Sequence, residues 1–291
     1  MFRGSIVALV TPMLDNGNID WPRLSQLIEW HIASGTDAIV AVGTTGESAT
    51  LSPSEHKAVV RYVVEQAAGR IPVIAGAGAN ATHEAIDLAL AAYEAGCAAT
   101  LQVVPYYNKP PQRGLYAHFK AIAEAVPMPH LLYNVPGRTS SDLLPETVCA
   151  LAAIDNIIGI KEASTMQRMQ ELYAVCPPDF TLLCGEDGLA AEAMCNGLVK
   201  GVVSVTANVA PDAMHAMTAA ALAGEHEHCY ALNDRLKDLH EAMFYECNPL
   251  PVKWALTRLG KIGGGIRLPL VPLAPDVQLR VEAALRRAAL L

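Results

Sequence analysis

Four short polar clusters in this sequence combine residue types that could act on carbonyl groups. Lys161 ends an apolar run as its one cation, and burial there would disfavour the ammonium form and leave a free amine able to attack a carbonyl. Tyr133 ends another run, where a phenol could relay protons, and Arg138 follows it, where a guanidinium could clamp a carboxylate. By position alone, Lys161 fits equally well as a lysine that extends outward at the rim of a sheet.

The other two clusters supply hydroxyl groups. Thr44 and Thr45 lie in the glycine-flanked turn Gly43–Glu47, whose hydroxyls and backbone N–H groups could hold a carboxylate. Taken by itself, this turn also fits an ordinary connection between a strand and a helix. Tyr106 and Tyr107 follow a further apolar run, and such a pair suits an interface, a site or both. Together the four clusters favour a keto acid bound as an imine and a second, carboxylated acceptor.

The elements that must position these residues are short strands that are apolar on both faces, as in a parallel sheet covered by helices. They recur at about the length of a βα unit. The runs are Ile6–Val10, Ala38–Val42, Ile71–Ala75, Thr100–Val104, His130–Tyr133, Ile157–Lys161, Thr181–Cys184 and Val202–Val205. Helical patterns lie between them, with Asp20 placed to cap the first and Ser52–Glu55 forming a capping box for the second. The pattern predicts an α/β fold, the (β/α)₈ TIM barrel, over a doubly wound open sheet, with the active site at the carboxyl ends of the strands.

The last part of the chain has a different pattern. From about Ala210 the strand signals stop and helical periodicity takes over. An apolar stripe runs from Cys229 to Met243, and a further helix is expected over about Asp276–Arg287. We therefore predict a catalytic barrel over residues 1–224 and a C-terminal helical region over residues 225–291, packed on the barrel.

Composition argues against several classes of function. The 291 residues are 52% apolar, which is enough for a large core. The net charge is −8 and the basic residues are scattered, which argues against nucleic acid and anionic membranes as partners. No apolar run approaches the ~18 to 20 residues that span a bilayer, and the first residues do not resemble a signal peptide. The seven cysteines include no Cys-x-x-Cys pair, so we expect a reducing, cytoplasmic location.

Two motifs that mimic cofactor sites are set aside. Gly76–Ala81 resembles a dinucleotide-binding loop, but the next strand closes with Val103 and Val104 instead of the acidic residue that would hold a ribose. His226 and His228 are two residues apart, so on a helix they point about 200° away from each other. A solvated helix face explains them better than a metal site. We expect no metal and no organic cofactor.

The assembled motifs closely resemble the dihydrodipicolinate synthase family, over essentially the whole chain. They are Gly43–Thr50, Pro105–Pro110, Tyr133–Thr139, Gly159–Ser164, Gly201–Val205 and Asn248–Lys253. The resemblance implies a Schiff-base-forming lyase that condenses pyruvate with L-aspartate 4-semialdehyde. The product, 4-hydroxy-tetrahydrodipicolinate, opens diaminopimelate and lysine biosynthesis. It also implies homotetramers built as pairs of dimers.

The resemblance further implies roles for single residues. Lys161 forms the imine and then the enamine with pyruvate. Tyr133 shuttles protons through a chain with Thr44 and with Tyr107, which comes from the neighbouring subunit. The substrate-binding residues are Thr45, Arg138 and Val203. Thr45 holds the pyruvate carboxylate together with Thr44, and Arg138 receives the carboxylate of the semialdehyde. The backbone of Val203 lines the keto-acid pocket.

Many bacterial members of this family are inhibited by lysine at a dimer interface. Glu84 could pair there with the ammonium groups of the ligand. Pro53 departs from some inhibited relatives, which carry histidine, and leaves the strength of inhibition open. Cys184 is a second departure and receives no role. The positions that match the inhibitor site are Ser48, Ala49, His56, Asn80, Glu84 and Tyr106.

Two alternatives remain open. N-acetylneuraminate lyases and keto-deoxy-sugar-acid aldolases of the same superfamily share Lys161 and Tyr133 but take a longer, polyhydroxylated aldehyde. Arg138 in its Pro-Gly-Arg-Thr setting and the Thr44–Thr45 doublet favour the synthase. A non-catalytic relative that only binds keto acids or lysine would be expected to lack a catalytic side chain, and none is missing.

Overall fold

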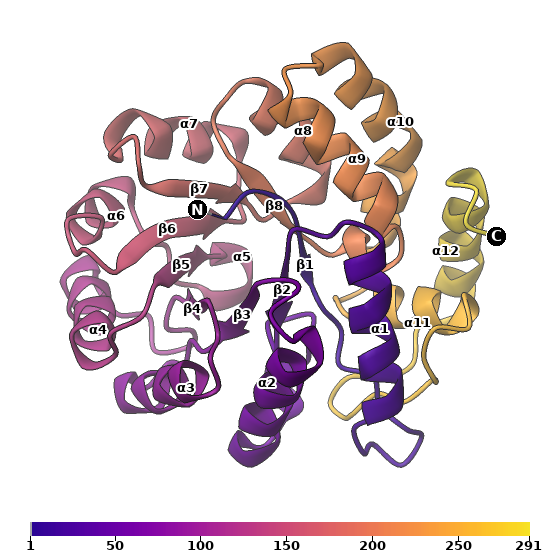
Figure 1. Cartoon of the computed structure of the whole chain (residues 1–291), viewed down its shortest axis with the longest axis horizontal. Coiled ribbons are helices and arrows are strands. Elements are labelled where there is room, and N and C mark those ends of the chain that lie inside the picture. Colours follow the sequence, from indigo (N-terminus) through magenta and orange to yellow (C-terminus); the bar gives the residue numbers. More distant parts are fainter. Residues whose placement is uncertain (1) are drawn as a thin grey trace.

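The computed structural model describes residues 2–291, and in this range eight parallel strands close into a barrel (Figure 1). Each strand pairs with the next in sequence, and β1 pairs with β8. The strands are β1 (Gly4–Ala8), β2 (Ala38–Ala41), β3 (Val73–Gly76), β4 (Ala99–Val103), β5 (His130–Asn134), β6 (Ile157–Glu162), β7 (Thr181–Cys184) and β8 (Gly201–Ser204). The predicted (β/α)₈ barrel is confirmed, and the β1–β8 pairing rules out an open sheet.

Helices surround the barrel and connect its strands (Figure 1). Both predicted caps are present: the Asp20 side chain accepts a hydrogen bond from the backbone of Arg23, and Ser52 and Glu55 form a capping box. The helices of the barrel are α1 (Trp21–Ala33), α2 (Pro53–Ala67), α3 (Thr82–Glu94), α4 (Gln112–Ala125), α6 (Pro145–Leu151), α7 (Met166–Val175), α8 (Asp187–Cys195) and α9 (Pro211–Leu222). Three short turns lie at the carboxyl ends of strands: η1 (Ser48–Thr50), α5 (Pro136–Thr139) and η2 (Thr206–Asn208).

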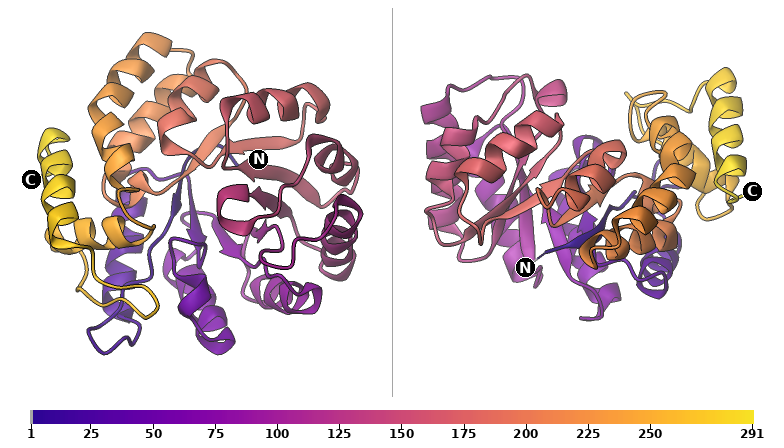
Figure 2. Two further views of the ribbon diagram at one scale, coloured as in Figure 1. Left: turned by 180° about the vertical axis from the view of Figure 1, so that it is seen from behind. Right: turned by 90° about the horizontal axis from the view of Figure 1, so that it is seen from above.

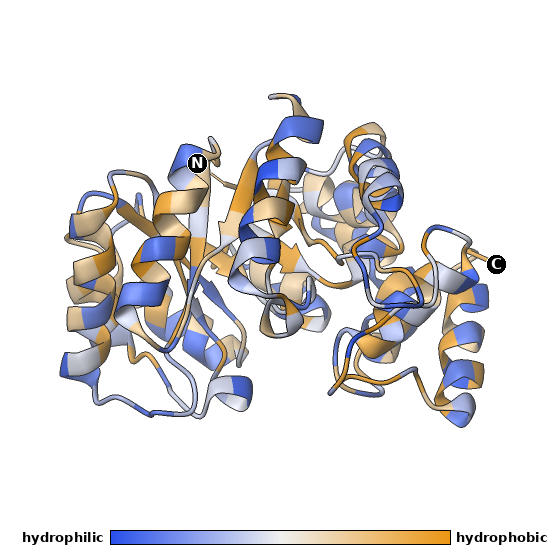
Figure 3. Ribbon diagram, turned by 90° about the horizontal axis from the view of Figure 1, so that it is seen from below, coloured by the Kyte–Doolittle hydropathy of each residue, from blue (hydrophilic) through white to orange (hydrophobic). Residues whose placement is uncertain are grey.

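Apolar side chains fill both faces of the barrel wall. One buried cluster lies inside the barrel and includes Ile6, Val40 and Leu131, while a larger one lies between the strands and the helices. Figure 3 shows the apolar strands at the centre of the molecule. Side chains alternate along a strand, and Ala163 belongs to the inner cluster. Lys161, two residues earlier, therefore faces the barrel interior.

The C-terminal segment contains three helices: α10 (His226–Ala242), α11 (Leu250–Arg258) and α12 (Pro275–Arg287). Helix α10 packs against α8, α9 and α12, and the predicted stripe of Cys229 to Met243 is buried except for the half-buried Leu232. Figure 2 shows this segment stacked on one side of the barrel. Helix α11 was not predicted. The proposed division between residues 224 and 225 falls just before α10, and it stays a prediction. None of the helices formed by residues 2–291 is long and apolar enough to cross a membrane.

Candidate active site

Lys161 and Tyr133 lie side by side at the carboxyl ends of adjacent strands. Tyr133 of β5 is in register with Lys161 of β6. Both side chains are buried, with Lys161 only 6% exposed, and the Lys161 Nζ atom lies 4.2 Å from the centroid of the Tyr133 ring. The amine is thus shielded from bulk water and faces a phenol, which is the environment that imine formation and proton transfer require.

The turn that carries Thr44 and Thr45 is shaped by unusual backbone geometry. Val42 has φ of 55°, a conformation that β-branched residues rarely adopt. Its carbonyl group passes so close to Gly76 on β3 that a Cβ atom there would collide with it. Thr45 is buried, and its hydroxyl oxygen accepts a hydrogen bond from Asn248 Nδ2 at 2.9 Å. Because the hydroxyl accepts from Asn248, its own hydrogen remains available to donate to a substrate carboxylate.

The same turn is held from outside the barrel by the C-terminal segment. Glu47 forms a buried ion pair with Lys253 of α11. A second contact comes from the loop after β1, where the Thr11 hydroxyl donates a hydrogen bond to the Gly46 carbonyl at 2.7 Å. Burial lowers the pKa of Lys253, and the adjacent Glu47 carboxylate opposes that shift. Sequence reasoning assigned no role to Glu47, Asn248 or Lys253. The only signals were that Glu47 lies in the family motif Gly43–Thr50 and that Asn248 and Lys253 lie in the family motif Asn248–Lys253.

One cavity brings together the predicted active-site residues except Tyr107 and Val203. It is lined by Thr44, Thr45, Tyr133, Arg138, Lys161 and, among others, Glu186 and Asn248. Arg138 projects from α5, and its guanidinium forms no ion pair with any carboxylate of residues 2–291; its Nη1 atom lies 3.8 Å from Cys247 Sγ. Arg138 is therefore free to bind a carboxylate in the cavity.

Three other residues are not part of this lining. Val203 is buried in the inner barrel cluster, and Val205 lines the cavity instead. Tyr107 is 88% exposed and does not line the cavity of its own chain. Cys184 is buried, and burial raises the pKa of its thiol to about 12, which keeps it in the thiol form at neutral pH.

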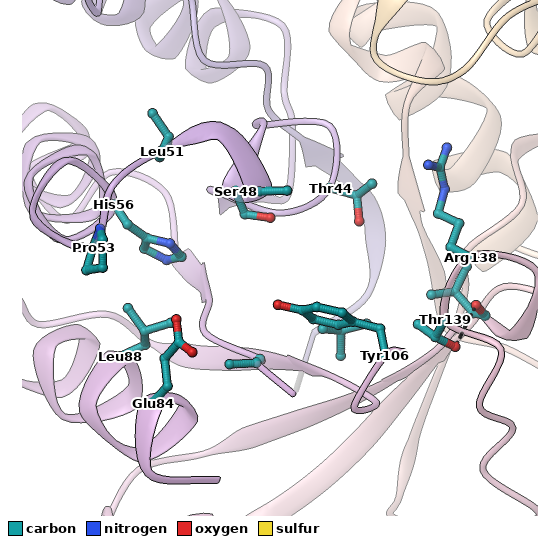
Figure 4. A pocket seen from close by; sticks show the side chains of 15 residues that line it. Thr44, Ser48, Leu51, Pro53, His56, Glu84, Leu88, Tyr106, Arg138 and Thr139 are labelled. Atoms are coloured by element: carbon teal, nitrogen blue, oxygen red, sulfur yellow. Dashed lines mark hydrogen bonds between the residues drawn. The ribbon is translucent and has the colours of Figure 1, made fainter. Parts of the chain in front are cut away.

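A second cavity of about 400 Å³ adjoins the first and contains five of the six predicted lysine-site residues (Figure 4). Thr44 and Arg138 line both cavities. Ser48, Ala49, His56, Glu84 and Tyr106 belong to the second one, together with Pro53. Asn80 does not line it; its side chain donates a hydrogen bond to the Tyr106 carbonyl at 3.2 Å.

The chemistry of this second cavity suits a ligand with ammonium groups. His56 Nε2 donates to the Gly76 carbonyl at 2.7 Å, and burial lowers the pKa of His56, so its ring is neutral and Nδ1 can accept a hydrogen bond. Burial, together with the nearby Glu84 carboxylate, raises the pKa of Tyr106 and keeps its phenol protonated. A carboxylate, an imidazole acceptor and a phenol therefore surround the space seen in Figure 4.

The motifs set aside as cofactor sites have structural explanations. Gly76 ends β3, and its lack of a Cβ atom makes room for the Val42 carbonyl. His226 and His228 are exposed in the first turn of α10. In the part of the chain that the structure describes, no group of three or more His, Cys, Asp or Glu residues is arranged to hold a metal ion.

A parallel eight-stranded barrel with a buried, inward-facing lysine beside a tyrosine at its carboxyl end has the architecture of a Schiff-base aldolase. Comparison with known proteins specifies the family. The family model described as "Dihydrodipicolinate synthetase family" matches residues 1–288, and the chain belongs to this family. It is accordingly an enzyme, a lyase of the class I aldolase superfamily.

Individual relatives agree with this assignment. The chain is 60% identical to the 4-hydroxy-tetrahydrodipicolinate synthase of Dichelobacter nodosus over 275 residues, which cover 94% of this chain and 93% of that protein. A crystal structure of the chloride-inhibited dihydrodipicolinate synthase of Acinetobacter baumannii with pyruvate superposes with a TM-score of 0.98, at 50% identity and with full coverage of both chains. The Cyanidioschyzon merolae enzyme with lysine bound gives a TM-score of 0.96 at 40% identity, covering 100% of this chain and 99% of that one.

Proposed function

We propose that this enzyme condenses pyruvate with L-aspartate 4-semialdehyde to give 4-hydroxy-tetrahydrodipicolinate. The observation that carries the proposal is the buried Lys161 amine, 4.2 Å from the Tyr133 ring centroid. The same cavity is lined by Arg138, which forms no ion pair within residues 2–291. The names of the similar enzymes from Dichelobacter nodosus and Acinetobacter baumannii support it.

In the proposed reaction, the Lys161 amine attacks the keto carbon of pyruvate and water leaves, which gives an imine. The pyruvate methyl group then loses a proton to form an enamine, and the enamine carbon attacks the aldehyde of the acceptor. The acceptor nitrogen closes the ring on the imine carbon and releases Lys161. Tyr133 carries the protons for these steps, in a chain with Thr44, while Thr44 and Thr45 hold the pyruvate carboxylate.

Arg138 is proposed to bind the carboxylate of the acceptor. A guanidinium matches a carboxylate in geometry and charge, and Arg138 has no competing carboxylate partner in residues 2–291. The sugar-derived acceptor of an N-acetylneuraminate lyase carries hydroxyl groups and no carboxylate, so it would leave this cation unpaired. The charge of the cavity therefore favours the synthase over that rival.

A paired assay tests the proposed function. With pyruvate present, we expect the enzyme to turn over aspartate semialdehyde. The rate is measured by coupling the reaction to a reductase that consumes the cyclic product. N-acetylmannosamine should give a kcat/KM lower by about 10-fold or more, because it has no carboxylate to accept the charge-assisted hydrogen bonds of Arg138. Comparable rates with the two acceptors would assign the enzyme to the sugar-acid aldolases instead.

We further propose a homotetramer built as a pair of dimers in the cytoplasm. Tyr107 is 88% exposed, and a second copy of the chain packed at this edge would receive it as part of the proton relay. The cysteines are all free thiols, which suits a reducing compartment.

L-Lysine is the proposed inhibitor at the second cavity. A ligand that binds only the folded protein stabilises it by about 1.4 kcal/mol at ten times its Kd, so L-lysine should raise Tm by ~3 to 5 °C. Thermal unfolding with and without the amino acid measures this shift. The Glu84→Gln variant should unfold at the native Tm without lysine and show little shift with it, because the ammonium groups lose their carboxylate. An unchanged Tm of the native protein at millimolar lysine would mean that the cavity is not a lysine site.

A further inference from the structure

Glu186 has no role in the proposed reaction, yet it is the one carboxylate among the residues that line the active-site cavity within the described chain. It follows β7 and immediately precedes α8. Its backbone N–H donates a hydrogen bond to Cys184 Sγ at 3.4 Å, and the Cys184 thiol donates one to its backbone carbonyl at 3.1 Å. These two bonds hold the main chain in place. Its side chain, in contrast, makes no hydrogen bond or ion pair with another group of residues 2–291.

Two cations and one carboxylate act on Glu186. Burial and the neighbouring Asp187 carboxylate raise the pKa of the Glu186 carboxyl, and the positive charges of Lys161 and Arg138 act in the opposite direction. Glu186 therefore lies within electrostatic range of the amine that forms the imine and of the guanidinium proposed to bind the acceptor. Glu186 is half-buried, and its carboxylate oxygens are free to accept hydrogen bonds from a ligand in the cavity.

Asn248 adds an independent observation. It lines the same cavity and is only 5% exposed. Its Nδ2 atom donates to Thr45, but its Oδ1 atom is buried and has no hydrogen-bond partner in residues 2–291. The cavity thus contains two oxygen acceptors, one charged and one neutral, for which the described chain provides no donor. A ligand that carries a charged N–H donor matches this pair.

We propose that Glu186, assisted by the Asn248 carbonyl oxygen, binds the α-ammonium group of the acceptor and so selects amino-substituted aldehydes. This inference rests on the proposed function. In aspartate semialdehyde the ammonium and the carboxylate are attached to one carbon, so their two counter-charges must lie close together. Arg138 and Glu186 line one cavity and interact electrostatically, as this requires. Arg138 takes the carboxylate, and Glu186 takes the nitrogen.

The same contact explains how the ring can close. The acceptor nitrogen must reach the imine carbon that is attached to Lys161, and it must first lose a proton, which passes to the Tyr133 relay of the proposed reaction. Glu186 lies near enough to Lys161 for the two charges to interact, so a nitrogen bound by Glu186 is held on the imine side of the cavity. Glu186 is in this sense a specificity-determining residue that also orients the nucleophile of the last step.

The test compares Glu186→Gln and Glu186→Asp with the native enzyme, using aspartate semialdehyde and its deaminated analogue, succinate semialdehyde. Removing the charge of a charge-assisted hydrogen bond should raise KM for aspartate semialdehyde about 10- to 30-fold in Glu186→Gln, with KM for pyruvate unchanged. Glu186→Asp should recover part of that loss. The inhibition constant of succinate semialdehyde should change less than about threefold, because this analogue has no ammonium group.

Arg138→Ala serves as the comparison, because it should weaken both aldehydes alike. Borohydride trapping of pyruvate on Lys161 shows whether Glu186→Gln retains an intact first half-reaction. Two results would contradict the ammonium contact while leaving the proposed function intact. In the first, Glu186→Gln turns over aspartate semialdehyde with the native KM. In the second, Glu186→Gln binds both aldehydes more weakly by the same factor. If the native enzyme does not use aspartate semialdehyde at all, the proposed function itself fails.

Discussion

Replacing Lys161 with alanine is expected to abolish covalent capture of pyruvate and to lower kcat by at least about 10³-fold, equivalent to ~4 kcal/mol of transition-state stabilisation. The reason is chemical: no other amine lines the cavity in residues 2–291, so no imine and no enamine can form there. Incubation of the native enzyme with pyruvate and borohydride, followed by peptide mass spectrometry, should locate one reduced pyruvyl group on Lys161.

Lys237→Ala is the matched control, because Lys237 is an exposed lysine on α10, a helix outside the barrel. It should retain native labelling and native kcat. Thermal unfolding of Lys161→Ala distinguishes lost chemistry from lost structure. Labelling at a different lysine, or full turnover by Lys161→Ala, would contradict the Schiff-base mechanism.

Replacing Lys253 with methionine is expected to destabilise the fold by about 3 to 5 kcal/mol, because it leaves the Glu47 carboxylate buried without a counter-charge. For a chain of this size that corresponds to a fall in Tm on the order of 10 °C. The turn with Thr44 and Thr45 loses its support at the same time, so KM for pyruvate should rise as well. Thermal unfolding and steady-state kinetics measure the two effects.

Two further variants show whether the buried ion pair is the cause. The double variant Lys253→Met/Glu47→Gln should recover much of the lost stability, because it no longer contains an isolated buried charge. Lys57→Met should cost less than about 1 kcal/mol, because Lys57 pairs with Asp87 on the surface, where their side chains are 33% and 62% exposed. Equal Tm values for Lys253→Met and Lys57→Met would mean that burial of the pair contributes nothing.

The barrel and its reacting groups could be predicted because their signals are local. Each strand is a short apolar run, and the residue at its carboxyl end occupies the mouth of a parallel barrel whatever the details of packing. Lys161 and Tyr133 follow this rule, and the structure places them in register on neighbouring strands. Helix α11 was missed because Pro249 precedes its segment, Leu250–Arg258, Pro251 lies in its first turn, and the segment has no long apolar stripe of its own.

The sequence by itself therefore determined the alternation of strands and helices and the identity of the side chains at the strand ends. Only the tertiary structure decided what surrounds them. The contacts of Glu47 with Lys253 and of Thr45 with Asn248 join residues more than 200 positions apart, and no local pattern encodes such a pairing. The same holds for Glu186. Its proximity to the charges of Lys161 and Arg138 depends on how β7 pairs with β6. Periodicity reports which face of an element is buried, whereas the charge environment of a site depends on which distant elements meet there.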